Sequence, residues 1–584
     1  MEIREDLTPL KRRSAVLLVA LFLAFGAVHL RLAHLQLLEA GVWRRRAENN
    51  RLREVPLVSR RGRIYDRRGE LIADNLPTWK LFAFPDEARD LDETVLFLAS
   101  LGIAEAAPLR QTIAGRHIGR LAPLVVTNDL TWEQLVKVRA HQSDHPELAV
   151  VSGVRRHYPL AALTAHAVGH LRPISEAEVA ADPSLDPTTL VGAIGVEALH
   201  DGFLAGSVGE RFVVVSAVGQ QLGIVREQGA VAGLDLGVTL DVTLQRIAAD
   251  ALGDASGTVV ALEPDTGAVR VLYSAPSFDP NLFVGGLTHD EWTTLSEDPT
   301  HPLQNRAIQG VYPPGSTIKP LMALAGLGEQ ESTSDWAVTC RGRVILHGHP
   351  FRCWRRSGHG RLALVRSLEV SCDTYYYLLG QQLGIERMAD WFRRFGFERR
   401  TGIGLAAEAT GLVGTPEWSR RVRGTPWYPG EAVSVSIGQG PVLATALQMA
   451  RAYAALANGG RLVTPHLVER AVRPAAEDLG LDPDHLALVV EGLRMAVHGK
   501  DGTARSLARL PIAGKTGTAQ VARLQEGIRP DELPPHLRHH AWFVGWAPLE
   551  RPKLVVAVIV EHGGGGGSVA APAAGKVLEA SLRE

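Results

Sequence analysis

Residues 312–327 read Tyr-Pro-Pro-Gly-Ser-Thr-Ile-Lys-Pro-Leu-Met-Ala-Leu-Ala-Gly-Leu, a turn-forming run that leads into an apolar stretch. The Pro-Pro-Gly segment opposes helix on its own side, so we expect a buried helix to begin at or near Ser316. Ser316 and Lys319 then share one helical face. A serine hydroxyl needs a nearby base to act as a nucleophile, and a lysine amine in a dry site can lose its proton and be that base. The stretch therefore predicts a nucleophilic serine, with helix N–H groups beside it suited to an oxyanion.

Two further motifs follow along the chain. Ser371-Cys372-Asp373 stands in a stretch with helical character. Lys515-Thr516-Gly517-Thr518 follows Ala513-Gly514 and has the pattern of a strand edge, where small residues let a substrate backbone approach closely. The order S-x-x-K, S-x-N/D and K-T-G is the signature of serine enzymes that recognise penicillin.

With these motifs the chain resembles the class B penicillin-binding proteins, most of all the penicillin-binding protein 2 type that serves cell elongation. The resemblance also covers RRGRIYDRRGELIADN at 60–75 and NRAIQGVYPPGSTIKP at 305–320, and it extends over nearly the whole chain. It implies a serine-type DD-transpeptidase that cross-links peptidoglycan and is acylated by β-lactams. The usual second motif ends in Asn. Asp373 resembles the elongation type instead, and the effect of an acidic group on the proton network is left open.

The resemblance implies a catalytic role for five motif residues. Ser316 attacks the penultimate D-Ala carbonyl of a stem peptide that ends in D-Ala-D-Ala, and Lys319 takes its proton. Ser371 relays a proton to the departing D-Ala, while Asp373 and Lys515 shape that network. An amine from a neighbouring stem peptide then resolves the acyl-enzyme, whereas β-lactams stall at the acyl stage.

The third motif is implied to bind substrate. Its residues Thr516, Gly517 and Thr518 form the binding strand, and Lys515, Thr516 and Thr518 hold the terminal carboxylate of the stem peptide. The backbone N–H groups of Ser316 and Thr518 are implied to form the oxyanion hole.

The N-terminal region has the pattern of a membrane anchor. Residues 14–30 contain no Asp, Glu, Lys or Arg, and leucines continue the apolar pattern to residue 38. The length of this stretch, 17 residues, is near the lower limit of about 17–25 residues for a membrane-spanning helix. The basic residues at 11–13 predict a cytoplasmic N-terminus, a single pass through the inner membrane and an exported body. A cleaved signal peptide is the alternative, but Ala24-Phe25-Gly26 is a poor cleavage site.

We therefore divide the chain into a cytoplasmic tail (1–13), a transmembrane helix (14–38), an elongated β-rich pedestal of the dimerisation type (39–235) and a transpeptidase domain (236–584). In the last part, residues 258–262 and 268–273 predict an antiparallel hairpin, 541–547 and 554–560 two more strands, and 573–582 a closing helix. Strands at both ends of a helical middle predict an α+β domain with a central antiparallel sheet flanked by helices.

The three cysteines, Cys340, Cys353 and Cys372, lie in one short region with His359 among them. Thiolates with one imidazole suit a closed, structural zinc site. Exported domains meet oxidising conditions, so a Cys340–Cys353 disulfide with Cys372 free is an alternative, as are three unlinked thiols.

The ligand set has a second open point, because His347 or His349 can replace His359. The resemblance supports a metal, since some members of the type bind zinc in this insert with carboxylate, His and Cys ligands. In this chain Cys340 and Cys353 would replace carboxylates. We expect no organic cofactor.

Composition excludes some partners. A net charge of −1 offers no broad basic face for nucleic acid. The apolar N-terminal helix predicts the membrane as a partner. The resemblance implies three other partners, which are stem peptides ending in D-Ala-D-Ala, β-lactams and a SEDS-family glycan polymerase that the protein also activates. A β-lactamase of the same fold is disfavoured because no convincing deacylation Glu motif is present. A β-lactam sensor is disfavoured because only 13 residues precede the span.

Overall fold

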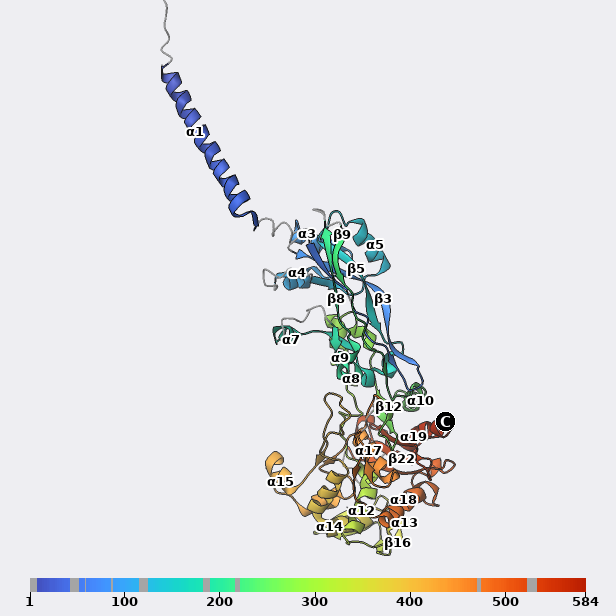
Figure 1. The fold of residues 1–584 in the computed structure, drawn as a ribbon. Coiled ribbons are helices and arrows are strands. Elements are labelled where there is room, and N and C mark those ends of the chain that lie inside the picture. The colour runs from blue at the N-terminus through green and yellow to red at the C-terminus, as the bar shows by residue number, and fades with distance from the viewer. Residues whose placement is uncertain are drawn as a thin grey trace, which may run out of the picture. The chain divides into compact units, whose positions relative to one another are not determined.

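The computed structural model describes residues 8–41, 52–57, 59–85, 88–114, 124–181, 190–215, 221–469, 474–521 and 533–583. The chain falls into two compact units (Figure 1). The first comprises residues 1–60, 77–154 and 207–231, and the second comprises 61–76, 155–206 and 232–584. The region before residue 232 therefore contributes to both units, and the large C-terminal part belongs to one of them.

A long apolar helix opens the described chain. Helix α1 (Thr8–Ala33) continues into a π-helical turn, η1 (His34–Leu38). The segment Arg13–Leu38 is the one helix in the described ranges that is long and apolar enough to cross a membrane, and none of it is buried within the protein. A helix that is apolar all round fits a membrane anchor. This agrees with the span predicted at 14–38.

The first unit has a small core and a separate antiparallel ribbon. The strands β3 (Leu71–Ala83, in its later part), β4 (Leu124–Thr127) and β5 (Leu148–His157) accompany helices α3 (Leu91–Ser100), α4 (Ala106–Ala114) and α5 (Trp132–Ala140). Leu81, Leu98 and Leu135 lie in the shared core. The ribbon has the order β1 (Leu52–Leu57), β8 (Gly209–Val215) and β9 (Gln221–Gln228).

The second unit begins with a buried ion cluster. Glu197, in helix α8 (Gly195–Leu199), has no solvent exposure. Its carboxylate accepts hydrogen bonds from Nε of Arg61 at 2.6 Å and Nε of Arg156 at 2.7 Å. Buried charges persist when they are paired and hydrogen-bonded in this way. The cluster therefore joins Arg61, at the start of the motif at 60–75, to Arg156 and Glu197 much later in the chain.

The same motif is tied to the first helix of the C-terminal part, α10 (Val242–Leu252). The Asp66 carboxylate accepts the N–H group of Val242, and Asp241 accepts hydrogen bonds from Arg67 and Arg68. Asp241 also caps α10 by accepting the N–H group of Leu244. The charged residues of the RRGRIYDRRGE pattern therefore hold the start of helix α10.

A five-stranded antiparallel sheet forms the centre of the C-terminal part, in the order β12–β11–β23–β22–β21. The strands are β11 (Gly257–Leu262), β12 (Val269–Ala275), β21 (Ala513–Ala519), β22 (His540–Ala547) and β23 (Leu554–Val560). They confirm the predicted hairpin and the two later strands. The third motif occupies β21, which is an edge strand, so one side of its backbone is open to pair with an extended peptide.

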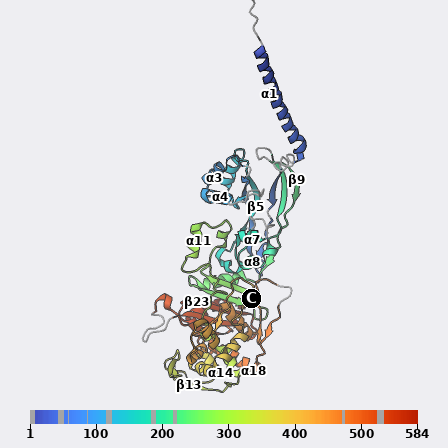
Figure 2. The ribbon, with the colours of Figure 1, turned by 90° about the vertical axis from the view of Figure 1, so that its left-hand side faces the viewer.

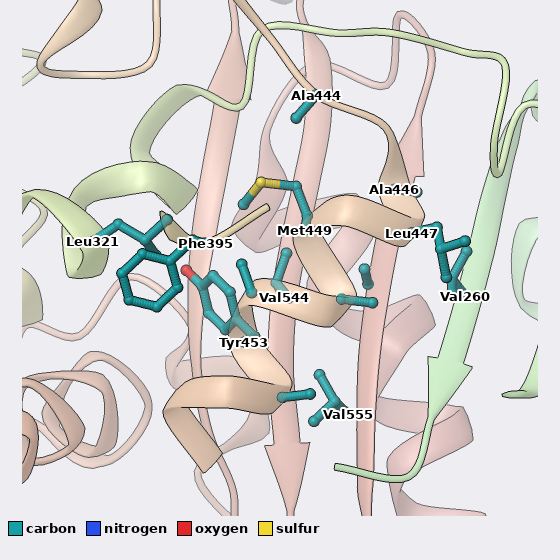
Figure 3. Packing of buried hydrophobic residues seen from close by; sticks show 14 of the residues in the cluster. Val260, Leu321, Phe395, Ala444, Ala446, Leu447, Met449, Tyr453, Val544 and Val555 are labelled. Atoms are coloured by element: carbon teal, nitrogen blue, oxygen red, sulfur yellow. The ribbon is translucent and has the colours of Figure 1, made fainter. Parts of the chain in front are cut away.

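Helices cover both faces of this sheet (Figures 1 and 2). Helices α10 and α19 (Ala571–Leu582) pack on one face with Val259, Phe543 and Val558. On the other face α17 (Ala446–Ala457) lies against the sheet, and Figure 3 shows its Met449 and Tyr453 among Leu321, Val544 and Val555. The strands are apolar on both faces because both faces are covered.

The C-terminal part contains further helices. They are α11 (His289–Ser296), α12 (Lys319–Gly328), α13 (Leu364–Glu369), α14 (Asp373–Arg394), α15 (Pro416–Trp418), α16 (Pro429–Val435) and α18 (Pro483–His498). An insert between α12 and α13 holds two small antiparallel sheets of two strands each, β13 (Val338–Cys340) with β16 (Gly360–Leu362), and β14 (Arg343–Leu346) with β15 (His349–Arg352).

Candidate active site

Ser316 lies in a 3₁₀ turn, η5 (Gly315–Ile318), and the α-helix α12 begins only at Lys319. We expected an α-helix from about Ser316. An α-helix would need the residue at 320 to donate an N–H group to the Ser316 carbonyl, and Pro320 has none. The Lys319 N–H group bonds this carbonyl instead. In a 3₁₀ turn, side chains three residues apart eclipse one another, so Ser316 and Lys319 are kept on one side.

The two side chains differ in their surroundings. Ser316 is half-buried, and among the described residues its hydroxyl has no hydrogen-bond partner. Lys319 is fully buried. Its Nζ donates to the Ser371 carbonyl at 2.9 Å and forms an ion pair with Oδ1 of Asp373 at 2.7 Å. The second motif therefore surrounds the lysine of the first.

Ser371 stands between two amines. Its Oγ is 3.3 Å from Nζ of Lys319 and 2.9 Å from Nζ of Lys515. Ser371 lies between α13 and α14 with a φ of +53°, a left-handed conformation that is unfavourable for a residue with a side chain. The strain is held by the two flanking helices, and it turns the hydroxyl into the space between the lysines.

Burial changes the acidity of one of these amines. Lys515 has no solvent exposure. Its desolvation, together with repulsion from Lys319, lowers the pKa of Lys515 well below the usual lysine value, although Asp373 opposes the shift. A buried ammonium group without a close counter-ion is expected to behave in this way. The Lys515 amine therefore releases a proton more easily than an ordinary lysine does.

The edge strand β21 packs directly on the serine turn. A Cβ at Gly315 would lie 2.8 Å from O and 3.2 Å from N of Thr518. Gly315 also has a φ of +54° and donates its N–H group to the Gly438 carbonyl at 2.8 Å. Only glycine permits both the conformation and this approach. The backbone N–H group of Ser316 is thereby brought next to the backbone of Thr518.

The threonines of the third motif differ in exposure. Thr516 is buried, and its hydroxyl donates to Oγ1 of Thr503 at 2.8 Å. Thr518 is half-exposed, and its carbonyl accepts a hydrogen bond from Nε2 of Gln439 at 2.9 Å. Gly517 lies between them with Thr317 and Trp542 too close to admit a side chain. The strand therefore presents hydroxyl groups and backbone, with little side-chain bulk.

The sequence matches the penicillin-binding protein transpeptidase domain over residues 257–579 and the penicillin-binding protein dimerisation domain over residues 56–238. The chain belongs to the penicillin-binding protein family. The resemblance drawn from the three motifs and the predicted fold class are both confirmed. By its domain, this member of the family is an enzyme of the transpeptidase type.

Relatives cover almost the full chain. The peptidoglycan D,D-transpeptidase MrdA of Haemophilus influenzae is 34% identical over a stretch covering 98% of this chain and 92% of its own. The penicillin-binding protein PBP2 of Helicobacter pylori, solved in complex with MreC, has a TM-score of 0.78 at 27% identity and covers 91% of this chain and 99% of its own. A structure of a peptidoglycan synthase complex has a TM-score of 0.70 at 32% identity and covers 97% of this chain and 98% of its own.

Several residues around the penicillin-binding motifs were not singled out from the sequence. The Tyr453 hydroxyl donates to the Thr317 carbonyl at 2.7 Å, and Nε1 of Trp542 donates to the Pro313 carbonyl at 3.1 Å. Both bonds hold the serine turn in place. Gly438 and Gln439 belong to the run Ser-Ile-Gly-Gln-Gly at 436–440. Two glycines so close together are a turn signal, and that signal was available in the sequence.

The three cysteines and His359 come together at the base of the insert. Their ligand atoms all lie within 4.8 Å of one another. Nδ1 of His359 is 3.7 Å from Sγ of Cys340 and 3.5 Å from Sγ of Cys353. Ligand atoms of a tetrahedral zinc ion with these donors lie roughly 3.5 Å apart, so the group fits zinc. Neither His347 nor His349 belongs to the group.

The thiols are free, and no disulfide links these three described cysteines. Cys353 and Cys372 share a hydrogen bond, which lowers the pKa of Cys353 and raises the pKa of Cys372. Cysteine binds a metal as the thiolate, so a bound cation would take the place of thiol protons in this group.

Proposed function

We propose that this penicillin-binding protein is a serine-type DD-transpeptidase that cross-links peptidoglycan stem peptides during cell elongation through an acyl-enzyme on Ser316. We further propose that its N-terminus is cytoplasmic and that the catalytic domain works on the outer side of the inner membrane. The observation that supports the chemistry best is the convergence of three distant motifs, in which the amines of Lys319 and Lys515 both lie at hydrogen-bond distance from the Ser371 hydroxyl. The relatives that are named peptidoglycan D,D-transpeptidases support the substrate class.

In the acylation step, the Ser316 oxygen bonds to the penultimate D-Ala carbonyl carbon, and its proton passes to the Lys319 amine. The oxyanion of the tetrahedral intermediate accepts hydrogen bonds from the N–H groups of Ser316 and Thr518. The C–N bond then breaks, and Ser371 delivers a proton to the nitrogen of the departing D-Ala. A donor peptide lying along β21 has its terminal carboxylate beside Thr516, Thr518 and Lys515.

Lys319 must lack a proton when Ser316 attacks, although it is ion-paired with Asp373 at rest. Ser371 offers a route for that proton. Its oxygen accepts a proton from Lys319 while its own proton passes to Lys515, the amine 2.9 Å away. The net result is the transfer of one proton from Lys319 to Lys515, and Ser371 is unchanged. In this scheme Asp373 keeps the positive charge near Lys319 at rest, which is a role that Asn cannot fill.

Deacylation needs a second amine. The amine of a neighbouring stem peptide attacks the ester carbonyl, loses a proton to the Lys319 network, and releases Ser316 with a new peptide cross-link. A β-lactam enters the same first step, but its leaving nitrogen stays attached after ring opening. The acyl-enzyme therefore persists, and β-lactams inhibit the protein covalently.

We also propose a structural zinc ion held by Cys340, Cys353, His359 and Cys372. The ion would cross-link the insert to the start of α14, and no catalytic step passes through it. The spacing of the donor atoms supports this assignment. Metal analysis of the purified protein is expected to find about one zinc per chain, and a chain free of metal would exclude the site.

We propose, finally, that the protein docks on a SEDS-family glycan polymerase and activates it. A similar chain occurs in a peptidoglycan synthase complex, and another in a complex with MreC. The apolar helix α1 supplies a segment that can meet a membrane partner within the bilayer. Co-purification of the full-length protein with the polymerase tests this, and the variant Ser316→Ala is expected to bind equally well.

The central test is mass spectrometry of the full-length protein after exposure to penicillin. A stable adduct on Ser316 is expected, and Ser316→Ala should lose both the adduct and cross-linking activity. An adduct on another side chain, or none, would overturn the assignment. Rapid turnover of penicillin without a lasting adduct would identify a β-lactamase instead.

A further inference from the structure

Trp354 is an exposed residue of the insert whose two N–H groups donate to the second motif and to the residue before it. It follows the buried Cys353, and 59% of its surface is exposed. Its backbone N–H group donates to Oδ2 of Asp373 at 2.8 Å. Its indole N–H group donates to the carbonyls of Val370 and Ser371, both at 3.1 Å. Core packing does not explain a tryptophan that is exposed and yet makes these bonds.

The two acceptors that matter are shared with the catalytic lysine. The Asp373 carboxylate accepts a hydrogen bond from Nζ of Lys319 on Oδ1 and one from the backbone N–H group of Trp354 on Oδ2, so both of its oxygens are occupied. The Ser371 carbonyl receives both Nζ of Lys319 and the indole N–H group of Trp354. Trp354 thus touches the two groups that hold the amine, without touching the amine itself.

Holding these acceptors fixes the position of the amine. A carboxylate with one free oxygen can turn about its terminal torsion, whereas one with both oxygens bonded cannot turn without breaking a bond. The Ser371 carbonyl belongs to a residue with a φ of +53°, and a strained peptide needs outside contacts to keep its orientation. The indole is one such contact.

We propose that Trp354 is a positioning residue for acylation. It holds the Asp373 carboxylate and the Ser371 carbonyl in the orientation that aims the Lys319 amine at Ser316. This inference rests on the proposed function, because it presumes that Lys319 serves Ser316. This role also links the insert to catalysis. Cys353 and Cys372 belong to the cysteine group, and the residues that follow them, Trp354 and Asp373, share a hydrogen bond.

The test variant is Trp354→Phe, which keeps an aromatic ring and the backbone N–H group that bonds Asp373, and removes only the indole donor to the Ser371 carbonyl. The control is Trp292→Phe, in helix α11 of the same unit, where the side chain is 48% exposed. Both are prepared as full-length protein. Stopped-flow acylation by a fluorescent penicillin is measured over a range of concentrations, which separates the limiting acylation rate from the dissociation constant of the non-covalent complex.

We expect Trp354→Phe to lower the limiting rate about tenfold, the loss that a modest misalignment of a catalytic group produces, with an unchanged dissociation constant. Trp292→Phe should leave both values unchanged. If Trp354 had only a structural role, Trp354→Phe would lower the thermal midpoint without lowering the limiting rate selectively. If Trp354→Phe does not fold, Trp354→His, which keeps a ring N–H group, is measured in the same way and is expected to lose less than tenfold.

Two outcomes would overturn the proposal. One is a limiting rate within twofold of wild type in the folded variant, and the other is an effect on the dissociation constant alone, which would make Trp354 a ligand contact. Failure of the proposed function looks different, because the wild-type protein itself would then form no penicillin adduct on Ser316.

Discussion

The contact between Gly438 and Gly315 sets the position of Ser316, the proposed nucleophile, and Gly438→Ala is the sharpest test of it. Gly438 has a φ of +74°. A Cβ there would lie 2.2 Å from O and 2.6 Å from N of Gly315. These are backbone atoms, so no side chain can move aside. To reach an ordinary contact of about 3.4 Å, the two segments must separate by roughly 1.2 Å.

That separation moves the residue next to Ser316 and breaks the hydrogen bond from Gly315 to the Gly438 carbonyl. A misplacement of about 1 Å lowers the rate of an oriented reaction by about 100-fold. Acylation by penicillin should fall by that factor. The thermal midpoint should also fall, because an alanine at positive φ costs about 1–2 kcal/mol and the lost hydrogen bond about 1 kcal/mol more.

The matched control is Gly424→Ala. Gly424 has a φ of +67°, but nothing lies within 4 Å of a Cβ built there. It carries the same backbone penalty without the clash, so its stability should fall slightly while its acylation rate stays at the wild-type value. The reasoning would be refuted if folded Gly438→Ala were acylated within threefold of wild type, or if both variants lost acylation equally.

Three other predictions use different parts of the protein. Tyr453→Phe leaves the Thr317 carbonyl without its 2.7 Å donor in a buried place, so the free energy of unfolding should fall by about 1–3 kcal/mol and acylation should slow; a thermal midpoint equal to wild type contradicts this. Burial lowers the pKa of His166 to about 4, so the unfolded state takes up the proton first and stability should fall as the pH drops from about 6.5 toward 4. Between pH 7.5 and pH 5 the loss is about 2 kcal/mol, and His166→Asn should show a shallower pH dependence in thermal unfolding than wild type. Removal of metal by a chelator should lower the thermal midpoint of wild type but not of Cys340→Ser, and equal sensitivity of the two would argue against zinc at the cysteines.

Much of the catalytic part could be predicted because its signals are local. Strands such as Leu554–Val560 are uninterrupted apolar runs, and the hairpin at 257–275 has a turn of Pro, Asp and Gly between its strands. The 3₁₀ turn at Ser316 was also available from Pro320, whose missing N–H group rules out the first α-helical bond. The position of Ser316 beside Lys319 does not depend on this turn.

The partner of Lys319 could not be predicted from the sequence. The pairing of Lys319 with Asp373, and the place of Ser371 between two amines, depend on α12, α14 and β21 meeting in space. The same holds for Trp354 and Gly438, which contact the motifs from the insert and from the loop after α16. No pattern within one segment reports a contact with another segment far along the chain.

The amino-acid sequence by itself determined the chemical inventory of this protein. It supplied a serine, two lysines and an acidic second motif in a diagnostic order, an apolar helix at the start, and four soft donor residues in one insert. Only the tertiary structure decided which of these groups touch and which are buried. The physical reason is that hydrogen bonds and desolvation act over a few ångströms of space, whereas the residues concerned are separated by long stretches of chain.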